Sequence, residues 1–78
     1  MQIVIYGTPT CSVCKQAREW LDEQGTAYTY EDLTEMPRHR AQAIIEYSQM
    51  KTVPIIYDGG HLIGGFDKLK PYVQGELF

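Results

Sequence analysis

The sequence predicts an α/β domain in which one mixed four-stranded sheet has helices on both faces, in the order β-α-β-α-β-β-α. In the first 32 residues, an apolar run, an amphipathic run and an aromatic run follow one another, which is the order of a βαβ unit with parallel strands. Later in the chain, Asp58-Gly59-Gly60 separates two short apolar runs and is typical of a β-hairpin. A parallel pair and an antiparallel pair in one small chain indicate a mixed sheet.

The composition is that of a single domain, residues 1–78. Apolar residues make up 44% of the chain, enough for a compact core, and charged residues make up 22%. The net charge of −3 predicts no nucleic-acid partner and no anionic membrane partner. Met1-Gln2-Ile3 lacks the basic start and long apolar core of a signal peptide, so we expect the reducing cytoplasm as the location. We also expect a monomer.

The βαβ unit begins with Gln2–Tyr6, a run of β-branched residues that suits a strand buried on both faces. A helix is expected from about Ser12 to Gln24, ended by Gly25 in the left-handed conformation. Its apolar positions recur at helical spacing: Val13, Cys14, Ala17, Trp20 and Leu21. The alternating segment Ala27–Asp32 is the expected second strand.

A second helix is expected after the connection Leu33–Met36, because Pro37 suits the first turn of a helix. Its inward stripe is predicted to consist of Ala41, Ile44, Ile45 and Ser48. His39 is expected on the surface of its first turn.

Two short strands, Ile55–Tyr57 and His61–Ile63, form the predicted hairpin. A last helix follows, with Asp67 as its expected N-cap. Pro71 removes a backbone hydrogen bond, so this helix should be short or irregular. The tail 75–78 is expected to fray unless Leu77 and Phe78 dock.

Cys11 and Cys14 are the only cysteines and lie between the first strand and the first helix. A Cys-x-x-Cys at such a junction is typical of a dithiol redox motif. If the helix begins near Ser12, Cys11 is its N-cap, and the unpaired N–H groups and helix dipole favour a thiolate there. Lys15, one turn further on, adds positive charge.

The two cysteines are expected to have different roles. Because the thiolate is the attacking species in disulfide exchange, Cys11 is the expected nucleophile. Cys14 shares the inward face with Ala17 and Leu21, so it should be the more buried, and it is placed to resolve a mixed disulfide formed at Cys11.

Two other interpretations of the cysteine pair are weaker. A static disulfide would close too small a loop to stabilise much of a fold. A structural zinc site normally needs four ligands, and only His39 and His61 remain, without zinc-site spacing. We therefore favour redox chemistry and expect no metal.

Three motifs together resemble the glutaredoxin family over essentially the whole chain: Cys11-Ser12-Val13-Cys14, Thr52-Val53-Pro54 and Gly64-Gly65-Phe66-Asp67. The chain is similar in particular to small bacterial and phage glutaredoxins, near the glutaredoxin-like redoxins that serve ribonucleotide reductase. The resemblance implies a thioredoxin-like fold, with Cys11 as the nucleophile and Cys14 as the resolving cysteine.

The resemblance also implies a glutathione site. Pro54 matches the family's cis-proline, and a cis Val53–Pro54 bond would turn the backbone of Val53 outward, to pair with the cysteine part of glutathione or an extended peptide. Gly65, Phe66 and Asp67 match the place that holds the γ-glutamyl end. A helix N-terminus suits a carboxylate there, and Asp67 suits an ammonium group.

The sequence departs from the family pattern beside this site. Ser12 and Val13 replace the proline and tyrosine of the commonest motif, so the groove wall at Val13 is altered. Thr8 stands where an upstream lysine is often found. Lys51, just before Thr52, is the expected replacement partner for a glutathione carboxylate, with Gln49 as another candidate.

The expected function is a glutathione-linked thiol–disulfide oxidoreductase that reduces protein disulfides or glutathione mixed disulfides, with ribonucleotide reductase as a client. Thioredoxin reductase is an alternative reductant. Ser12 and the missing motif proline also leave open a carrier of a [2Fe–2S] cluster, in which glutathione bridges two copies. An interaction module that uses Tyr28 and Tyr30 is a third alternative.

Overall fold

The computed structural model describes residues 1–75, which form four strands, three α-helices and one 3₁₀ turn. In chain order these are β1 (Ile3–Gly7), α1 (Ser12–Gln24), β2 (Tyr28–Asp32), the 3₁₀ turn (Leu33–Glu35), α2 (Arg38–Ser48), β3 (Ile55–Asp58), β4 (His61–Gly64) and α3 (Phe66–Gln74). The predicted order is confirmed. The expected docking of Leu77 and Phe78 concerns residues outside the described range.

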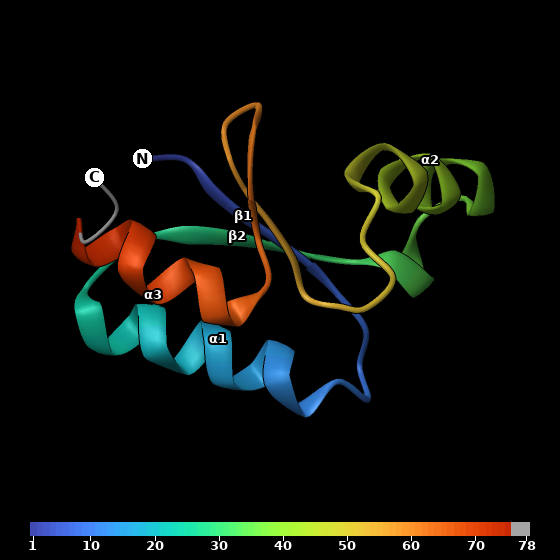
Figure 1. Ribbon diagram of the computed structural model, residues 1–78. Coiled ribbons are helices and arrows are strands. Elements are labelled where there is room, and N and C mark those ends of the chain that lie inside the picture. Colours follow the sequence, from blue (N-terminus) through green and yellow to red (C-terminus); the bar gives the residue numbers. More distant parts are fainter. Residues whose placement is uncertain (76–78) are drawn as a thin grey trace.

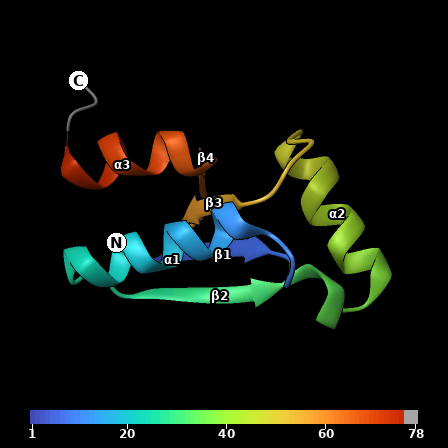
Figure 2. The same ribbon diagram turned by 90° about the horizontal axis from the view of Figure 1, so that it is seen from below.

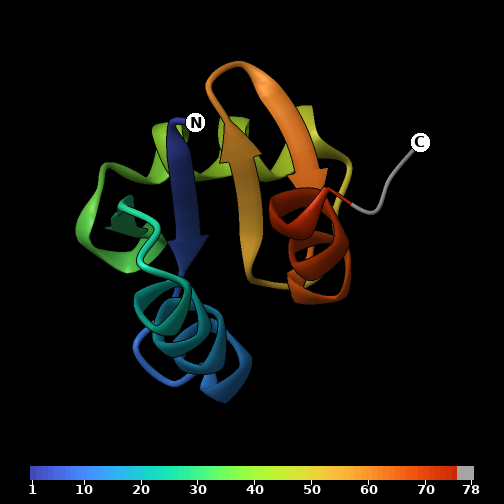
Figure 3. The ribbon, with the colours of Figure 1, turned by 90° about the vertical axis from the view of Figure 1, so that its left-hand side faces the viewer.

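The sheet has the strand order β2-β1-β3-β4. β1 pairs in parallel with β2, placing Ile5 opposite Tyr30, and antiparallel with β3. β3 and β4 form the antiparallel hairpin, so the sheet is mixed as predicted. Helices α1 and α3 lie side by side on one face (Figures 1 and 2), and α2 crosses the other face behind the strands (Figure 3).

The core lies between the sheet and the two helices α1 and α3. Its fully buried members come from all three: Ile3, Ile5, Ala17, Leu21, Ile56 and Leu69. β1 alternates buried and half-buried side chains, so the expectation that both of its faces are buried is only partly right. Because Ala17 and Leu21 fix α1 against the sheet, the first turn of α1 is held just beyond the end of β1. Gly25 ends α1 with a φ of 70°, as predicted.

The inward stripe predicted for α2 is only partly right. Ser48 is buried, and its hydroxyl donates to the Ile45 carbonyl oxygen at 2.9 Å while accepting the Met50 N–H at 3.2 Å. The Ile45 side chain, however, is 40% exposed. His39 is exposed, as expected.

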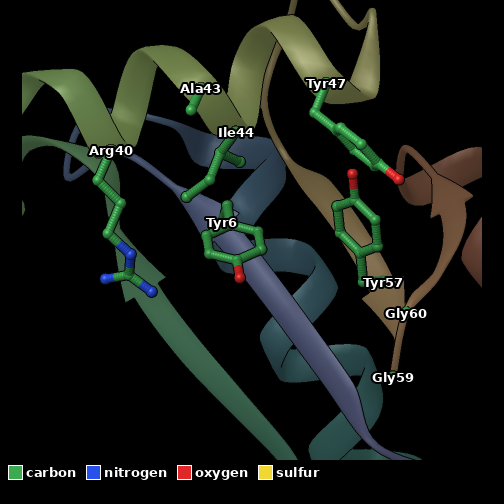
Figure 4. Close-up of a pocket in the computed structure, with 8 residues that line it drawn as sticks. All are labelled: Tyr6, Arg40, Ala43, Ile44, Tyr47, Tyr57, Gly59 and Gly60. Carbon is green, nitrogen blue, oxygen red and sulfur yellow. The ribbon is translucent and has the colours of Figure 1, made fainter.

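The least exposed side chains of α2 are Ala41, Ile44 and Ser48, three of the four that were predicted to face inward. Beside them, an open hollow of about 460 Å³ lies above Tyr6 and Tyr57, and α2 lines it with Arg40, Ala43, Ile44 and Tyr47 (Figure 4). The rings of Tyr6 and Tyr57 meet edge to face with their centroids 6.1 Å apart. Helical spacing therefore identified the inward face of α2 and misplaced only Ile45, at its edge.

Asp58, at the end of β3, ties three parts of the fold together. Its carboxylate accepts the Gln2 N–H at 2.7 Å and the Tyr72 hydroxyl of α3 at 2.6 Å. The hydrogen bond from Tyr72 is the main cause that holds the pKa of Asp58 below its ordinary value, and the bond from Gln2 adds to it. The same bond to Asp58 raises the pKa of Tyr72.

Helix α3 begins at Phe66 with Gly65 as its N-cap, so the prediction that Asp67 caps this helix is wrong. The extended backbone of Gly65 starts the helix two residues earlier and leaves Asp67 in the first turn. Pro71 lies inside the helix, which is nine residues long and ends at Gly75 with a φ of 72°. No helix within residues 1–75 has the length and apolar character that crossing a membrane requires.

Candidate active site

Cys11 caps helix α1, as the sequence predicted. Its backbone is extended, with φ −88° and ψ 106°, and its sulfur accepts the backbone N–H of Cys14 at 3.1 Å. The Cys11 N–H donates to the Thr8 carbonyl oxygen at 3.2 Å, which fixes the turn that leads into the helix. The Cys11 sulfur therefore receives a backbone hydrogen bond and lies at the positive end of the helix dipole.

Cys14 has the opposite surroundings. It is 1% exposed, which confirms that it is the more buried cysteine, and both cysteines are free thiols. Burial raises the pKa of the Cys14 thiol to about 12, and the hydrogen bond with Cys11 adds to the rise. A backbone contact with Thr8 and the charge of Arg18 act in the lowering direction. The site therefore pairs an accessible sulfur with a protected one.

Gly7, the last residue of β1, gives the Cys14 sulfur its space. A Cβ atom on Gly7 would lie 2.7 Å from the Cys14 Sγ, closer than real contacts allow. Sequence reasoning assigned no role to Gly7. Its structural role is to let the Cys14 side chain, seven positions further along the chain, come close to the backbone.

A groove lies beside the cysteines on the side of β3 and α3. We call it the Pro54 groove; it has a volume of about 530 Å³ and is lined by Val13, Thr52, Val53, Pro54, Gly65, Phe66, Asp67 and Lys70. The Val53–Pro54 peptide bond is cis, as the resemblance implied. The structure thus brings together three separate segments that the sequence had linked only by resemblance.

Lys51 does not line the Pro54 groove, so the expectation that it lies in this site is wrong. It lines an adjoining hollow with Ile45 and Met50, and only its neighbours Thr52 and Val53 border both spaces. An exposed side chain next to a turn is free to point either way, and Lys51 lines the adjoining hollow rather than the groove.

Lys70 supplies the positive charge that the sequence analysis missed. Its Nζ lies 4.9 Å from the centroid of the Phe66 ring, within the groove. The four-residue spacing of Phe66 and Lys70 on one helix was the available signal, because such residues share a face.

The Pro54 groove is suited to a ligand with both a carboxylate and an ammonium group. Asp67 provides a negative charge, while Lys70 and the free N–H groups at the start of α3 favour a carboxylate. Gly65 leaves room for the Asp67 side chain, because a Cβ atom at position 65 would lie 3.2 Å from an Asp67 carboxylate oxygen. Within residues 1–75, no three His, Cys, Asp or Glu side chains gather as a metal site would need.

Comparisons with known sequences point in one direction. A protein-family model described as Glutaredoxin matches residues 3–63. A glutaredoxin of Ricinus communis is 32% identical over 78 residues, spanning 96% of this chain and 76% of that protein. An uncharacterized glutaredoxin-like 8.6 kDa protein in a rubredoxin operon of Clostridium pasteurianum is 32% identical over 66 residues, spanning 85% of this chain and 87% of that one.

Solved structures agree with the sequence matches. A buckwheat glutaredoxin–glutathione complex superposes with a TM-score of 0.80 at 26% identity, covering 96% of this chain and 71% of that chain. Glutaredoxin 1 from Francisella tularensis, complexed with cacodylate, gives a TM-score of 0.76 at 26% identity, covering 96% and 94%. The fold is therefore thioredoxin-like.

Proposed function

Because the chain belongs to the glutaredoxin family, we propose that it is a glutathione-linked thiol–disulfide oxidoreductase that works through Cys11 and Cys14. The family and the fold support thiol–disulfide oxidoreductase activity in general. The observation that carries the proposal is the 3.1 Å hydrogen bond from the Cys14 N–H to the Cys11 sulfur at the start of α1, beside the Pro54 groove.

In the first step, the Cys11 thiolate attacks one sulfur of a substrate disulfide. A bond forms between Cys11 and that sulfur, the substrate's sulfur–sulfur bond breaks, and the second sulfur leaves as a thiolate that takes a proton from water. The start of α1 stabilises the attacking anion, with Lys15 at the rim of the same helix turn.

The second step depends on the substrate. On a protein disulfide, Cys14 attacks the Cys11 sulfur, which releases the client as a dithiol and leaves a Cys11–Cys14 disulfide. Two glutathione molecules then return this disulfide to the dithiol and become glutathione disulfide. On a glutathione mixed disulfide, glutathione remains on Cys11 and a second glutathione removes it, so Cys14 is not needed.

The Pro54 groove is the proposed glutathione site. Asp67 pairs with the ammonium group of the γ-glutamyl end, and Lys70 and the start of α3 bind its carboxylate. The backbone of Val53 then pairs with the cysteine part and holds its sulfur toward Cys11. The buckwheat glutaredoxin solved with glutathione supports this assignment by its similar fold.

We propose ribonucleotide reductase as a protein client, on the family resemblance, and a monomer in the cytoplasm, where a reducing environment keeps the dithiol active. Fractionation of cells that express the full chain, followed by detection of the protein, checks the compartment.

A coupled assay tests the proposed reductant. NADPH consumption is followed with glutathione and glutathione reductase, or with thioredoxin reductase alone, using a small mixed disulfide and ribonucleotide reductase as substrates. We expect turnover with the glutathione system. Turnover with thioredoxin reductase alone would replace glutathione as the reductant and leave the dithiol chemistry standing.

Two variants test the assigned roles. Cys11→Ser should lose all turnover, while Cys14→Ser should retain reduction of glutathione mixed disulfides and lose reduction of protein disulfides. A Cys11→Ser protein with full activity would contradict the assignment of the nucleophile.

A further inference from the structure

A second groove reaches the two sulfurs from the side of β2. We call it the Tyr30 groove; it has a volume of about 370 Å³ and is lined by Thr8, Pro9, Thr10, Cys11, Ser12, Cys14, Lys15, Arg18, Tyr30 and Asp32. The proposed glutathione site does not use it. Because β2 and β3 flank β1 on opposite sides, the two grooves approach the cysteine motif from opposite sides.

Tyr30 brings its hydroxyl group to the buried sulfur. The hydroxyl donates to the Thr8 carbonyl oxygen at 3.3 Å. A Cβ atom on Gly7 would lie 3.0 Å from the Tyr30 hydroxyl oxygen and 2.7 Å from the Cys14 Sγ. The hydroxyl and the sulfur therefore both lie beside Gly7, and Tyr30 and Cys14 line the same groove.

The guanidinium group of Arg18 lies over the Tyr30 ring. Its guanidinium carbon is 4.3 Å from the centroid of the Tyr30 ring, a cation–π distance. Arg18 follows Cys14 by four residues on α1, so the two side chains share a face of the helix. Within residues 1–75, Arg18 forms no ion pair with a carboxylate, so its charge is available to a nearby anion.

Cys14 needs such a charge when it reacts. Its burial raises the pKa of its thiol to about 12, whereas the charge of Arg18 acts to lower it. The other charged or titratable groups in the groove are Cys11 and Lys15 on α1, and Tyr30 and Asp32 on β2. Once Cys11 is bonded to a substrate it carries no charge, and Arg18 is the cation one helical turn from the Cys14 sulfur.

We propose that Arg18, held on the ring of Tyr30, is a positioning residue for the resolving step: its charge stabilises the anionic Cys14 sulfur as it attacks the mixed disulfide at Cys11. The inference rests on the proposed function. In this step the Cys14 thiol gives its proton to water, a Cys11–Cys14 bond forms, the bond from Cys11 to the substrate breaks, and the substrate thiolate leaves and takes up a proton.

The reaction of the reduced protein with the disulfide of 2-nitro-5-thiobenzoate separates this step from the first. Attack by Cys11 releases one coloured thiolate at a rate that depends on reagent concentration. Attack by Cys14 releases the second at a rate that does not. We expect Arg18→Gln to slow the second phase at neutral pH and to leave the first phase unchanged.

The expected size follows from thiol chemistry. Raising the pKa of Cys14 by one unit removes about nine-tenths of its thiolate, but each remaining thiolate is more nucleophilic, with a Brønsted coefficient of about 0.4–0.5. The net slowing for a one-unit change is therefore about threefold. The pH profile of the second phase should move to higher pH in Arg18→Gln and return in Arg18→Lys, which keeps the charge. Arg38→Gln, a change of the same charge on α2, should leave both phases as they are.

The outcomes separate the two proposals. Absence of the first phase in the natural sequence would overturn the proposed function itself. A normal first phase with an unchanged second phase in Arg18→Gln would overturn the role of Arg18 alone. Slowing that Arg18→Lys does not reverse would also overturn it, because the cause would then be lost packing against Tyr30 rather than lost charge.

Discussion

At the scale of single residues, the two cysteines lie close together but differ in how deeply they are buried. Cys11 accepts a backbone hydrogen bond at the open end of α1, and Cys14 lies against Gly7 under the first turn. The spacing of the motif and the expected start of the helix were enough to predict this difference. The space at Gly7 could not be predicted, because it depends on where a residue of β1 meets a residue of α1.

Substitution of Gly7 by alanine tests the packing around Cys14. The added methyl group would lie 2.7 Å from the sulfur, so either the strand end or the first turn of α1 must move. Overpacking of this kind costs about 1–3 kcal/mol. We expect denaturant unfolding to show a loss of that size, together with slower resolution by Cys14. Gly60→Ala, with no atom within 4 Å of the new Cβ, is the matched control.

The buried thiol also predicts a dependence of stability on pH. The unfolded thiol titrates near 9, whereas burial raises the pKa of Cys14 to about 12 in the folded protein. Between these values the unfolded chain binds fewer protons, so stability should fall as pH rises above about 9. Unfolding measurements under reducing conditions should find a flatter dependence in Cys14→Ser. Identical slopes for the two proteins would contradict the burial argument.

At the scale of elements, the sequence predicted what local signals control. The β-branched run, the glycine at the end of α1 and the Asp58-Gly59-Gly60 turn each determine their own element, and each is confirmed. The errors concern where a helix begins and which of its side chains face inward. Asp67 was a better N-cap residue than Gly65, yet the chain enters α3 two residues earlier, and Ile45 of α2 is exposed rather than inward.

Asp58 ties the hairpin to the rest of the fold. The turn motif in the sequence did not predict this link. The bonds of Asp58 to Tyr72 and Gln2 hold its pKa low, so the stability it contributes is present above its ordinary value of 3.8 and is lost as pH falls below that value. Asp58→Asn should lower the unfolding midpoint at neutral pH and flatten the dependence on acid pH. Asp22→Asn, an exposed change on α1, is the control; an equal effect of both changes would count against the proposed link.

At the scale of the whole molecule, two grooves meet at one pair of sulfurs. The resemblance predicted most of the residues that line the Pro54 groove. Its motifs lie at the ends of strands and helices, and the local sequence determines where these elements end. The resemblance could not predict that Lys51 lines the adjoining hollow instead, nor that Lys70 lines the groove from the second turn of α3. The direction of an exposed lysine depends on what the fold places beside it, here the ring of Phe66.

Lys70→Gln tests whether the charge in the Pro54 groove serves glutathione. An exposed charge pair contributes about 0.2–1 kcal/mol, so we expect the KM for a glutathione mixed disulfide to rise by up to about fivefold with kcat unchanged. Lys68→Gln, a neighbouring charge outside the groove, should have no such effect. An unchanged KM in Lys70→Gln would remove this lysine from the site.

The most direct test of the central claim is competitive alkylation of the reduced protein. A limiting amount of iodoacetamide is added at neutral pH, and peptide mass spectrometry locates the modified sulfur. The structure predicts modification of Cys11 well before Cys14, because the first sulfur caps α1 at the surface and the second is buried with a raised pKa. Equal labelling of both cysteines, or labelling of Cys14 first, would contradict the account.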